Sequence, residues 1–127
     1  GIRDAQESRW LGDVYKRQLE NGINLFVGEN AMENWAIIDK YKKRDSPPCT
    51  WFHLTSFPSC HVFLEIEPNK LTDEYIQKAA EICKQNTKHK NARNIKVDYT
   101  AITNIEKGTE YGSVDFKSLR KVNVIKI

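Results

Sequence analysis

The sequence lacks the features that mark membrane-spanning, secreted and nucleotide-hydrolysing proteins. It has no run of about 18 apolar residues and no charged N-terminal region followed by an apolar one, so we expect neither a membrane span nor a secretory signal. Neither a G-x-x-x-x-G-K-S/T nor a G-x-G-x-x-G phosphate-binding motif occurs. Cysteine is scarce, with Cys49, Cys60 and Cys83 as an odd number of widely spaced thiols. This usage favours reduced thiols inside the cell, and we expect a cytoplasmic protein with the nucleus as the alternative.

A strong charge of one sign is also missing. The chain has 127 residues, of which 39% are hydrophobic and 29% charged, enough for one domain with its own core. Its net charge of +3 is too small to indicate nucleic-acid binding by itself, so only the distribution of the charge bears on that question.

Residues 1–18 look foreign to the rest of the chain. They show no sustained hydrophobic period, and the hexapeptide DVYKRQ resembles one reading frame of the terminal repeat of a laboratory transposon. We therefore expect a leader at 1–18 and a single domain at 19–127. The alternative for the first segment is a native amphipathic helix through Trp10, Val14 and Tyr15.

The stretch TWFHLTSFPSCHVFLEI is the element around which we expect the domain to be built. Its residues alternate on either side of a proline-containing turn, Thr55–Ser59, which predicts two strands of a hairpin. One face is apolar, whereas the other places His53 opposite His61 and Trp51 opposite Phe63. Because a core does not need this second face, we expect it to serve function.

Two helices and further strands flank the hairpin. A strand at 23–28 leads into a helix with Asn30 as N-cap and Glu33 completing a capping box. Its expected buried stripe is Met32, Trp35, Ala36 and Ile38.

A second helix begins after Thr72, and the patterns at 95–102 and 120–127 predict strands, the last with Val122 and Val124 alternating. The interleaving predicts an α+β fold, a largely antiparallel sheet with two helices against one face, in the order β-α-β-β-α-β-β.

Several short motifs in this order resemble the NFACT RNA-binding domain. The residues that carry the resemblance are a glycine and two asparagines, a Trp-Phe-His triplet, a histidine before valine, the sequence VDYT at 97–100, and a lysine with two glycines: Gly28, Asn30, Asn34, Trp51, Phe52, His53, His61, Lys107, Gly108 and Gly112. The match extends over residues 23–127 and is most similar to the stand-alone branch of coiled-coil domain-containing protein 25.

The chain departs from the family pattern at three places. Cys49 and Thr50 stand where an acidic residue usually precedes the tryptophan, and Cys60 stands where a smaller residue is usual. The chain ends at Ile127, where the stand-alone branch would continue into a charged coiled coil.

The resemblance implies an RNA-binding domain without catalytic activity, linked to ribosome-associated quality control. The expected ligand is tRNA or ribosomal RNA, and DNA is a second candidate. Basic residues gather in three clusters, at 40–44, at 84–96 and at 117–126. The residues expected to bind nucleic acid are Lys84, Lys88, Lys90, Arg93, Lys96, Lys107, Lys43 and Arg44. The alternative is that these charges are merely solvated and that the domain is a protein-interaction module with unknown partners.

The aromatic face of the hairpin allows two interpretations. Trp51, His53, His61 and Phe63 either form a platform on which bases stack, or lie under the helices with the histidines hydrogen-bonded. In either case we expect His61 to be buried and His53 exposed.

Metal and nucleophile chemistry have little support in the sequence. Cys49 and His53 would lie on the same side of a strand about 13 Å apart, and the adjacent Cys60 and His61 point to opposite faces. No base-orienting residue or oxyanion hole is evident for a Cys-His pair. We therefore expect no cofactor and no enzyme activity.

Gly108 and Gly112 are interpreted as turn residues. They predict a turn that requires positive φ at both positions, with Lys107 at its mouth and Tyr111 either stacking or covering the core.

Overall fold

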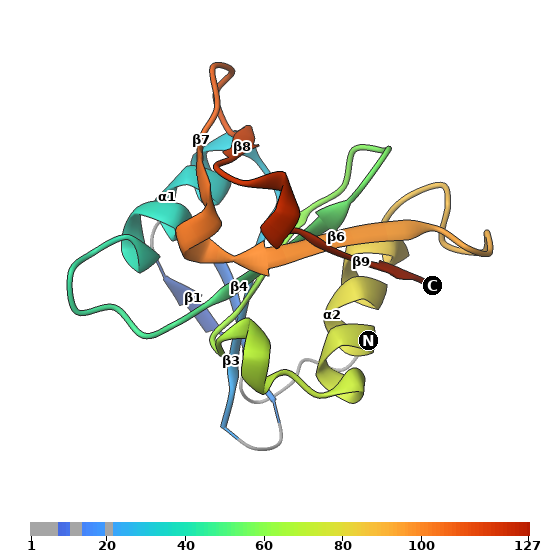
Figure 1. Ribbon diagram of the computed structural model, residues 1–127, viewed down its shortest axis with the longest axis horizontal. Helices are drawn as coiled ribbons and strands as arrows, with labels where there is room; N and C mark the ends of the chain where they lie inside the picture. Colours follow the sequence, from blue (N-terminus) through green and yellow to red (C-terminus); the bar gives the residue numbers. More distant parts are fainter. Residues whose placement is uncertain (1–7, 11–13, 20–21) are drawn as a thin grey trace.

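The computed structural model describes residues 8–10, 14–19 and 22–127 of the chain (Figure 1). Its main feature is a seven-stranded sheet in the order β1-β2-β3-β5-β4-β6-β9, in which every neighbouring pair is antiparallel. These strands are β1 Ser8–Trp10, β2 Val14–Gln18, β3 Asn24–Gly28, β4 Thr50–Leu54, β5 His61–Leu64, β6 Lys96–Ala101 and β9 Asn123–Lys126. A separate two-stranded sheet pairs β7 Ile105–Lys107 with β8 Val114–Phe116. The predicted α+β class with a largely antiparallel sheet and two α-helices is confirmed.

The helices begin where capping residues predict. Helix α1, Ala31–Tyr41, starts after Asn30, whose side chain accepts a hydrogen bond from the Glu33 backbone N–H at 2.9 Å. The Glu33 carboxylate accepts in turn from the backbone N–H of Glu29, one residue before the expected position. Helix α2, Asp73–Gln85, starts after Thr72, whose hydroxyl accepts from the Tyr75 N–H. Three 3₁₀ turns complete the fold: η1 Pro68–Lys70, η2 Ile102–Asn104 and η3 Leu119–Lys121.

The central hairpin has the predicted register. Trp51 lies opposite Phe63 and Phe52 opposite Val62, which brings the rings of His53 and His61 to 4.8 Å between centroids. The pair stands in the middle of the sheet, because β5 also pairs with β3 and β4 also pairs with β6. Both edges of the hairpin are therefore paired with neighbouring strands.

The two helices lie on opposite faces of the sheet, so the expectation that both pack on one face is wrong. Figure 1 shows α1 and α2 on either side of the central strands. Helix α2 contributes Ala79, Ala80 and Cys83 to a core with the aliphatic face of the hairpin. Helix α1 contributes Ile37, Ile38 and Tyr41 to a second core, whose other members are Phe26, Cys49, Trp51, Phe63, Ile102 and Ile105.

The phase of two elements also differs from the prediction. In α1 the buried residues are Glu33, Asn34, Ile37, Ile38 and Tyr41, while Met32 is 53% exposed. This face of the helix points inward because Ile37, Ile38 and Tyr41 pack with Trp51 in the second core.

Strand β9 buries the face opposite to the one that carries Val124, which the prediction used. Val124 is exposed, whereas Ile125 and Ile127 pack against the core beneath α2. The edge strand therefore buries its last isoleucines, and its alternate residues face outward.

The N-terminal segment forms strands in its described part. β2 pairs with β3, and β1 pairs with β2, so the interpretation of 8–10 and 14–18 as a helix is wrong. Residues 1–7 and 11–13 of the expected leader lie outside the described residues. Its origin as a leader stays a prediction.

Candidate nucleic-acid interface

The family-motif residues converge at the centre of the sheet, where β3, β5 and β4 meet the start of α1. Gly28 pairs with His61 across β3 and β5, and a Cβ on this glycine would overlap the Asn34 side-chain oxygen. Asn34 is buried, and within the described residues its Oδ1 has no hydrogen-bond partner. Glycine is thus required here for close approach of the helix to the strand.

His61 is held as a neutral acceptor. Trp51 donates its indole N–H to His61 Nδ1 at 3.0 Å, and an indole nitrogen has no other role than donor. The hydrogen of the imidazole is therefore on Nε2. Burial, with a smaller contribution from the neighbouring charge of His53, lowers the pKa of His61 to about 3. The prediction that this histidine is buried is confirmed.

His53 occupies the rim of the second core. It is half-buried rather than exposed, which corrects the expectation, because the indole ring of Trp51 stacks on it at 5.7 Å. Its Nδ1 donates to the carbonyl of Leu54 at 2.6 Å, and Asp98 lies opposite it on β6. Burial lowers the pKa of His53 despite the opposing effects of that hydrogen bond and of Asp98. Since Trp51 and Phe63 are buried, this aromatic face is a core and not a stacking platform.

The glycine loop between β7 and β8 packs on α1. Gly112 has φ +91° and lies so close to α1 that an added Cβ would stand 2.5 Å from Ala31 Cα. Gly108 has no positive φ, which corrects the prediction; a side chain there would overlap Ser113 instead. Trp35 donates its indole N–H to the Ser113 carbonyl at 2.9 Å, which ties the loop to the helix.

Lys107 belongs to this packed unit. Its ammonium group forms an ion pair with Asp39 at 2.8 Å and lies 5.1 Å from the centroid of the Trp35 ring. Tyr111 is 61% exposed and contacts the edge of the same ring. Lys107, the last residue of β7, therefore packs against α1 and lies apart from the basic residues that follow α2.

The turn of the central hairpin meets the loop after α2. The rings of Phe57 and His89 stack with centroids 3.9 Å apart. Beside them is an open cleft of about 700 Å³, lined by Glu29, residues 57–60 and residues 86–89. Lys88 lies on its wall, so one cation of the predicted cluster borders an aromatic stack.

The same loop leads into a pair of facing lysines at the edge of the sheet. Lys96 on β6 lies directly opposite Lys126 on β9, the edge strand, and both side chains are exposed. Like charges directly opposite on neighbouring strands are destabilising. The fold therefore concentrates positive charge here at a cost to its own stability.

A second lysine contact lies further along this edge. The Lys42 ammonium donates to the carbonyl of Ile105 and lies close enough to Lys117 to feel its positive charge. Burial and the charge of Lys117 lower the pKa of Lys42. Lys117 and Lys121 line a polar cleft of about 480 Å³ together with Thr100, Thr103, Asn104, Ser118 and Asn123.

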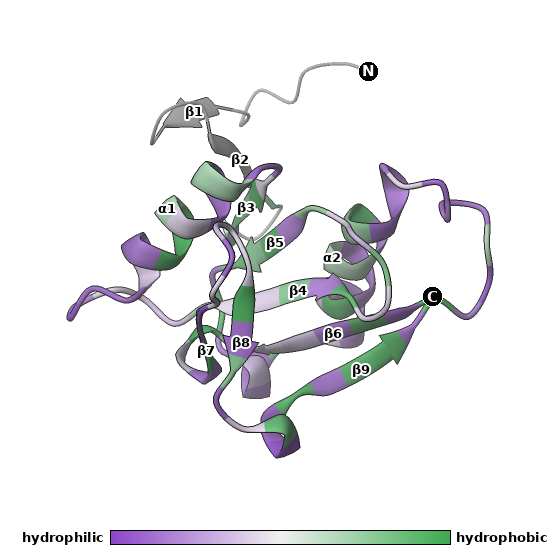
Figure 2. Ribbon diagram, turned by 90° about the horizontal axis from the view of Figure 1, so that it is seen from above, coloured by the Kyte–Doolittle hydropathy of each residue, from purple (hydrophilic) through white to green (hydrophobic). Residues whose placement is uncertain are grey.

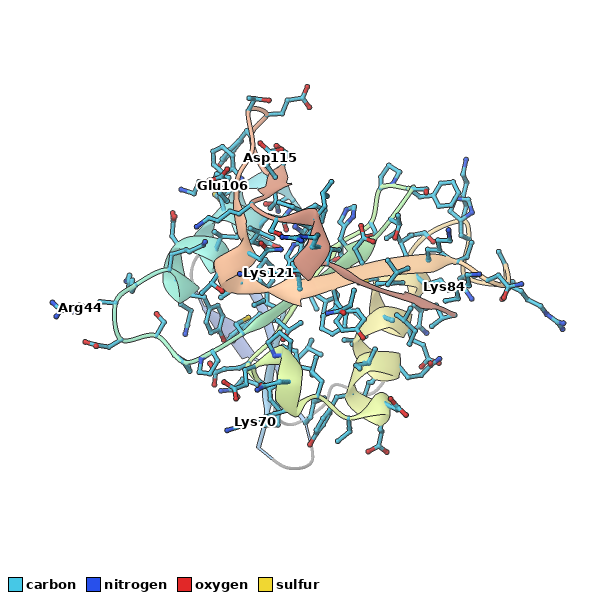
Figure 3. The ribbon with its side chains drawn as sticks, in the orientation of Figure 1. Arg44, Lys70, Lys84, Glu106, Asp115 and Lys121 are labelled. Atoms are coloured by element: carbon cyan, nitrogen blue, oxygen red, sulfur yellow. The ribbon has the colours of Figure 1, made fainter. Side chains whose placement is uncertain are left out.

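We call Lys96, Lys117, Arg120, Lys121 and Lys126 the basic edge. The described residues offer these five side chains no carboxylate within 4.0 Å, whereas Lys70 and Lys107 form ion pairs with Glu67 and Asp39. Acidic residues gather elsewhere: Glu106 faces Asp115 across β7 and β8, and Figure 3 shows both at the β7–β8 end, apart from Lys121.

The predicted binding residues separate into two groups. Lys84, Lys88, Lys90 and Arg93 lie in or beside the loop that leads to Lys96, and Figure 2 shows this loop as hydrophilic over most of its length. Arg44 lies at the opposite end of the molecule from Lys84 in Figure 3, with Lys43 beside it in the chain. The predicted residues missed the cross-strand partner Lys126 and the Lys42–Lys117 contact, because neither is visible until strand register is known.

The described part of the chain has neither a cluster of metal ligands nor a membrane-spanning helix. There, no three His, Cys, Asp or Glu side chains are grouped so as to hold a metal ion. No helix of that part is both long and apolar enough to cross a membrane.

Comparison with known proteins decides the family. The sequence model of the NFACT protein RNA binding domain matches residues 14–118. The chain belongs to this family. The match begins at the first residue of β2 and contains the buried residues of both cores, the motif cluster and the loop after α2.

Two proteins that are longer than this chain contain a similar domain. The chain is 31% identical over 107 residues to the Rqc2 homolog RqcH of Bacillus subtilis, and this alignment covers 82% of the chain and 18% of RqcH. The fold of the chain is similar to the C-terminal part of the fibronectin/fibrinogen-binding protein of Streptococcus suis, with a TM-score of 0.69, 22% identity, and coverage of 88% of this chain and 44% of the other. The chain thus spans less than a fifth of the curated relative that it matches.

Proposed function

We propose that this domain binds structured RNA, such as tRNA or ribosomal RNA, through the basic edge and the loop after α2, without catalysing a reaction. The observation that carries the proposal is the pair Lys96 and Lys126, two exposed cations directly opposite each other on β6 and the edge strand β9. A phosphate between them would offset their repulsion and release its condensed counterions.

The loop and the basic edge form one continuous surface. Ile95 and Ile127 bond to each other's backbone at 2.9 Å, so the loop ends where the lysine pair begins. Lys88, Lys90 and Arg93 extend the positive charge along the loop, and Phe57 and His89 add a partly exposed aromatic stack. Phosphate contacts fix position, and the stack offers one place where an unpaired base finds an aromatic partner.

The test is a polarisation titration of the chain with tRNA, single-stranded RNA and duplex DNA at about 50 and about 200 mM salt. We expect the tightest binding to structured RNA, with affinity falling steeply as salt rises. Absence of binding to every ligand at the lower salt concentration contradicts the proposal.

A matched pair of variants locates the surface. Lys96→Glu/Lys126→Glu keeps a like-charge pair across the two strands, so its stability stays close to that of the wild type while its affinity falls at least tenfold. Lys70→Glu/Lys78→Glu makes the same change in net charge at exposed lysines outside the basic edge, and should weaken binding far less. Equal losses in the two variants would mean that only net charge matters.

Lys43, Arg44 and Lys107 stay predictions for a second contact. Reversing Lys43 and Arg44 tests them separately from the basic edge. We expect a smaller loss of affinity, because these residues lie away from the loop after α2.

A protein-interaction module is the competing function. The exposed side chains of Met32 and Tyr111 beside Trp35 favour it, as does the name of the fibronectin/fibrinogen-binding protein whose fold is similar. Under this function the basic-edge variants bind RNA like the wild type, while Met32→Ser/Tyr111→Ser loses a protein partner.

A role in ribosome-associated quality control rests on the family and on the similarity to RqcH. Membership of the stand-alone branch of coiled-coil domain-containing protein 25 and an intracellular location rest on the motif residues and the cysteine usage alone. Co-sedimentation of the chain with ribosomal subunits, reduced by the Lys96→Glu/Lys126→Glu variant, would support the first of these.

A further inference from the structure

Two of the three cysteines are in contact, although the sequence separates them by a whole helix. Cys60 precedes β5 and Cys83 lies in the last turns of α2. Cys60 Sγ approaches the carbonyl of Ile82, the residue before Cys83, at 3.7 Å, and the two thiols are close enough that each shifts the pKa of the other. Both residues pack in the core beneath α2. The third cysteine, Cys49, is buried in the other core, across the sheet.

The two contacting thiols differ in access to solvent. Cys83 is fully buried, whereas Cys60 is half-buried and lines the cleft of about 700 Å³ between the hairpin turn and the loop after α2. A small oxidant can therefore reach one sulfur of the pair directly. The second sulfur lies behind the first, in position to react with whatever forms on it.

The two thiols also differ in pKa. The neighbouring Cys83 thiol lowers the pKa of Cys60, while burial raises the pKa of Cys83. Because the thiolate is the reactive form, the accessible sulfur is also the better nucleophile.

We propose that Cys60 and Cys83 form a reversible disulfide, in which Cys60 reacts first with a hydroperoxide and Cys83 resolves the product. The Cys60 thiolate attacks the O–O bond, forms an S–O bond and releases hydroxide, which takes up a proton to become water. Cys83 then loses its proton and attacks the sulfenic sulfur; the S–S bond forms and a second water leaves. Two thiols lose two electrons, and the hydroperoxide is reduced. A dithiol reductant restores the pair by exchange.

This inference does not depend on RNA binding. It concerns a covalent link between Cys60, which lines the cleft just before β5, and Cys83 in the last turns of α2. The reduced state of all three cysteines in the structure is its starting point.

The experiment is treatment of the reduced chain with a stoichiometric amount of hydrogen peroxide, followed by alkylation of the remaining thiols and peptide mapping by mass spectrometry. We expect a monomer lighter by two hydrogens, with a peptide linking Cys60 to Cys83, Cys49 alkylated after unfolding, and the link lost on addition of dithiothreitol. A product in which all three thiols remain free, or in which the link involves Cys49 or a second chain, overturns the proposal.

Two variants test the order of events. Cys83→Ala should stop at a sulfenic acid on Cys60 that a dimedone probe traps, whereas Cys60→Ala should leave Cys83 unreactive in the folded chain. Cys49→Ala is the control and should keep the link. Circular dichroism establishes that each variant is folded. Oxidation of Cys83 in folded Cys60→Ala at the rate at which the disulfide forms in the wild type would overturn the assigned roles.

Discussion

The motif cluster around His61 and the basic edge around Lys126 use polar residues in opposite ways. In the cluster, Trp51 satisfies the only acceptor of a neutral, buried imidazole, and the surrounding side chains exclude water. At the edge, Lys96 and Lys126 are exposed and repel each other. The first arrangement lowers the free energy of the folded state, whereas the second raises it.

This difference separates what identifies the family from what would bind its ligand. The tryptophan and the histidines are recognisable because the fold constrains their size and hydrogen bonding, and those constraints act in a core. Exposed lysines at the edge of the sheet lack such constraints, and under the proposed function contact with phosphates would constrain them. The following predictions test this division, beginning with the largest effect.

Removal of the Trp51 side chain should destabilise the domain without changing the basic edge. Trp51→Ala leaves a cavity in the second core and deprives His61 of its donor, so we expect a loss of about 3–5 kcal/mol in the free energy of unfolding. Urea denaturation measures it. Tyr111→Ala, which removes a large but exposed ring, is the control and should cost less than about 1 kcal/mol. Similar losses from both changes would remove the distinction between core and surface.

A side chain at Gly112 should separate α1 from the loop that covers the second core. Gly112→Ala combines a φ of +91° with a Cβ 2.5 Å from Ala31 Cα, and we expect a loss of about 2–4 kcal/mol. Gly22→Ala is a matched control, because its φ is +80° but an added Cβ meets nothing within 4 Å. That variant should lose only about 1–2 kcal/mol by thermal or urea unfolding. Equal losses would show that contact with α1 contributes nothing.

Acid should weaken the motif cluster through His61. In the unfolded chain this histidine takes up a proton below pH about 6.5, whereas in the folded chain its pKa is about 3. The unfolded state therefore binds more protons in this window, and stability falls by about 2 kcal/mol between pH 7.5 and 5.

The control for this prediction replaces the titrating group. His61→Gln should lose most of the slope, and the remainder comes from His53, whose pKa burial also lowers. A slope unchanged by His61→Gln would mean that the imidazole is already charged in the folded state.

The sequence predicted the elements of this fold better than their arrangement. Helix starts at Asn30 and Thr72 follow from local hydrogen bonding, and the hairpin register follows from alternation around Thr55–Ser59. The side on which α1 packs was predicted incorrectly, because the sequence left open whether Trp51 and Phe63 form a stacking platform or lie under a helix. Aromatic side chains satisfy either interpretation until the covering element is known.

The candidate site shows the same limit. Basic residues close in sequence, such as Lys88, Lys90 and Arg93, were found by counting charges. Lys126 lies opposite Lys96 only because β9 pairs antiparallel with β6, and no local pattern encodes that register. Long-range pairing therefore determines which charges meet.

The smallest expected change in stability gives the most direct test of the central claim, that the basic edge binds RNA at a cost to the fold. Lys126→Glu converts the facing lysines into an opposite-charge pair, so the domain should become more stable by about 0.2–1 kcal/mol. Its affinity for tRNA at low salt should fall several-fold, and the salt dependence of binding should become shallower.

Lys78→Glu, which makes the same charge change on the outer side of α2, is the control for that measurement and should leave affinity nearly unchanged. The decisive measurement is the tRNA affinity of Lys126→Glu beside its free energy of unfolding. We predict that affinity falls while stability rises. An affinity equal to that of the wild type in a variant that is at least as stable would contradict the account.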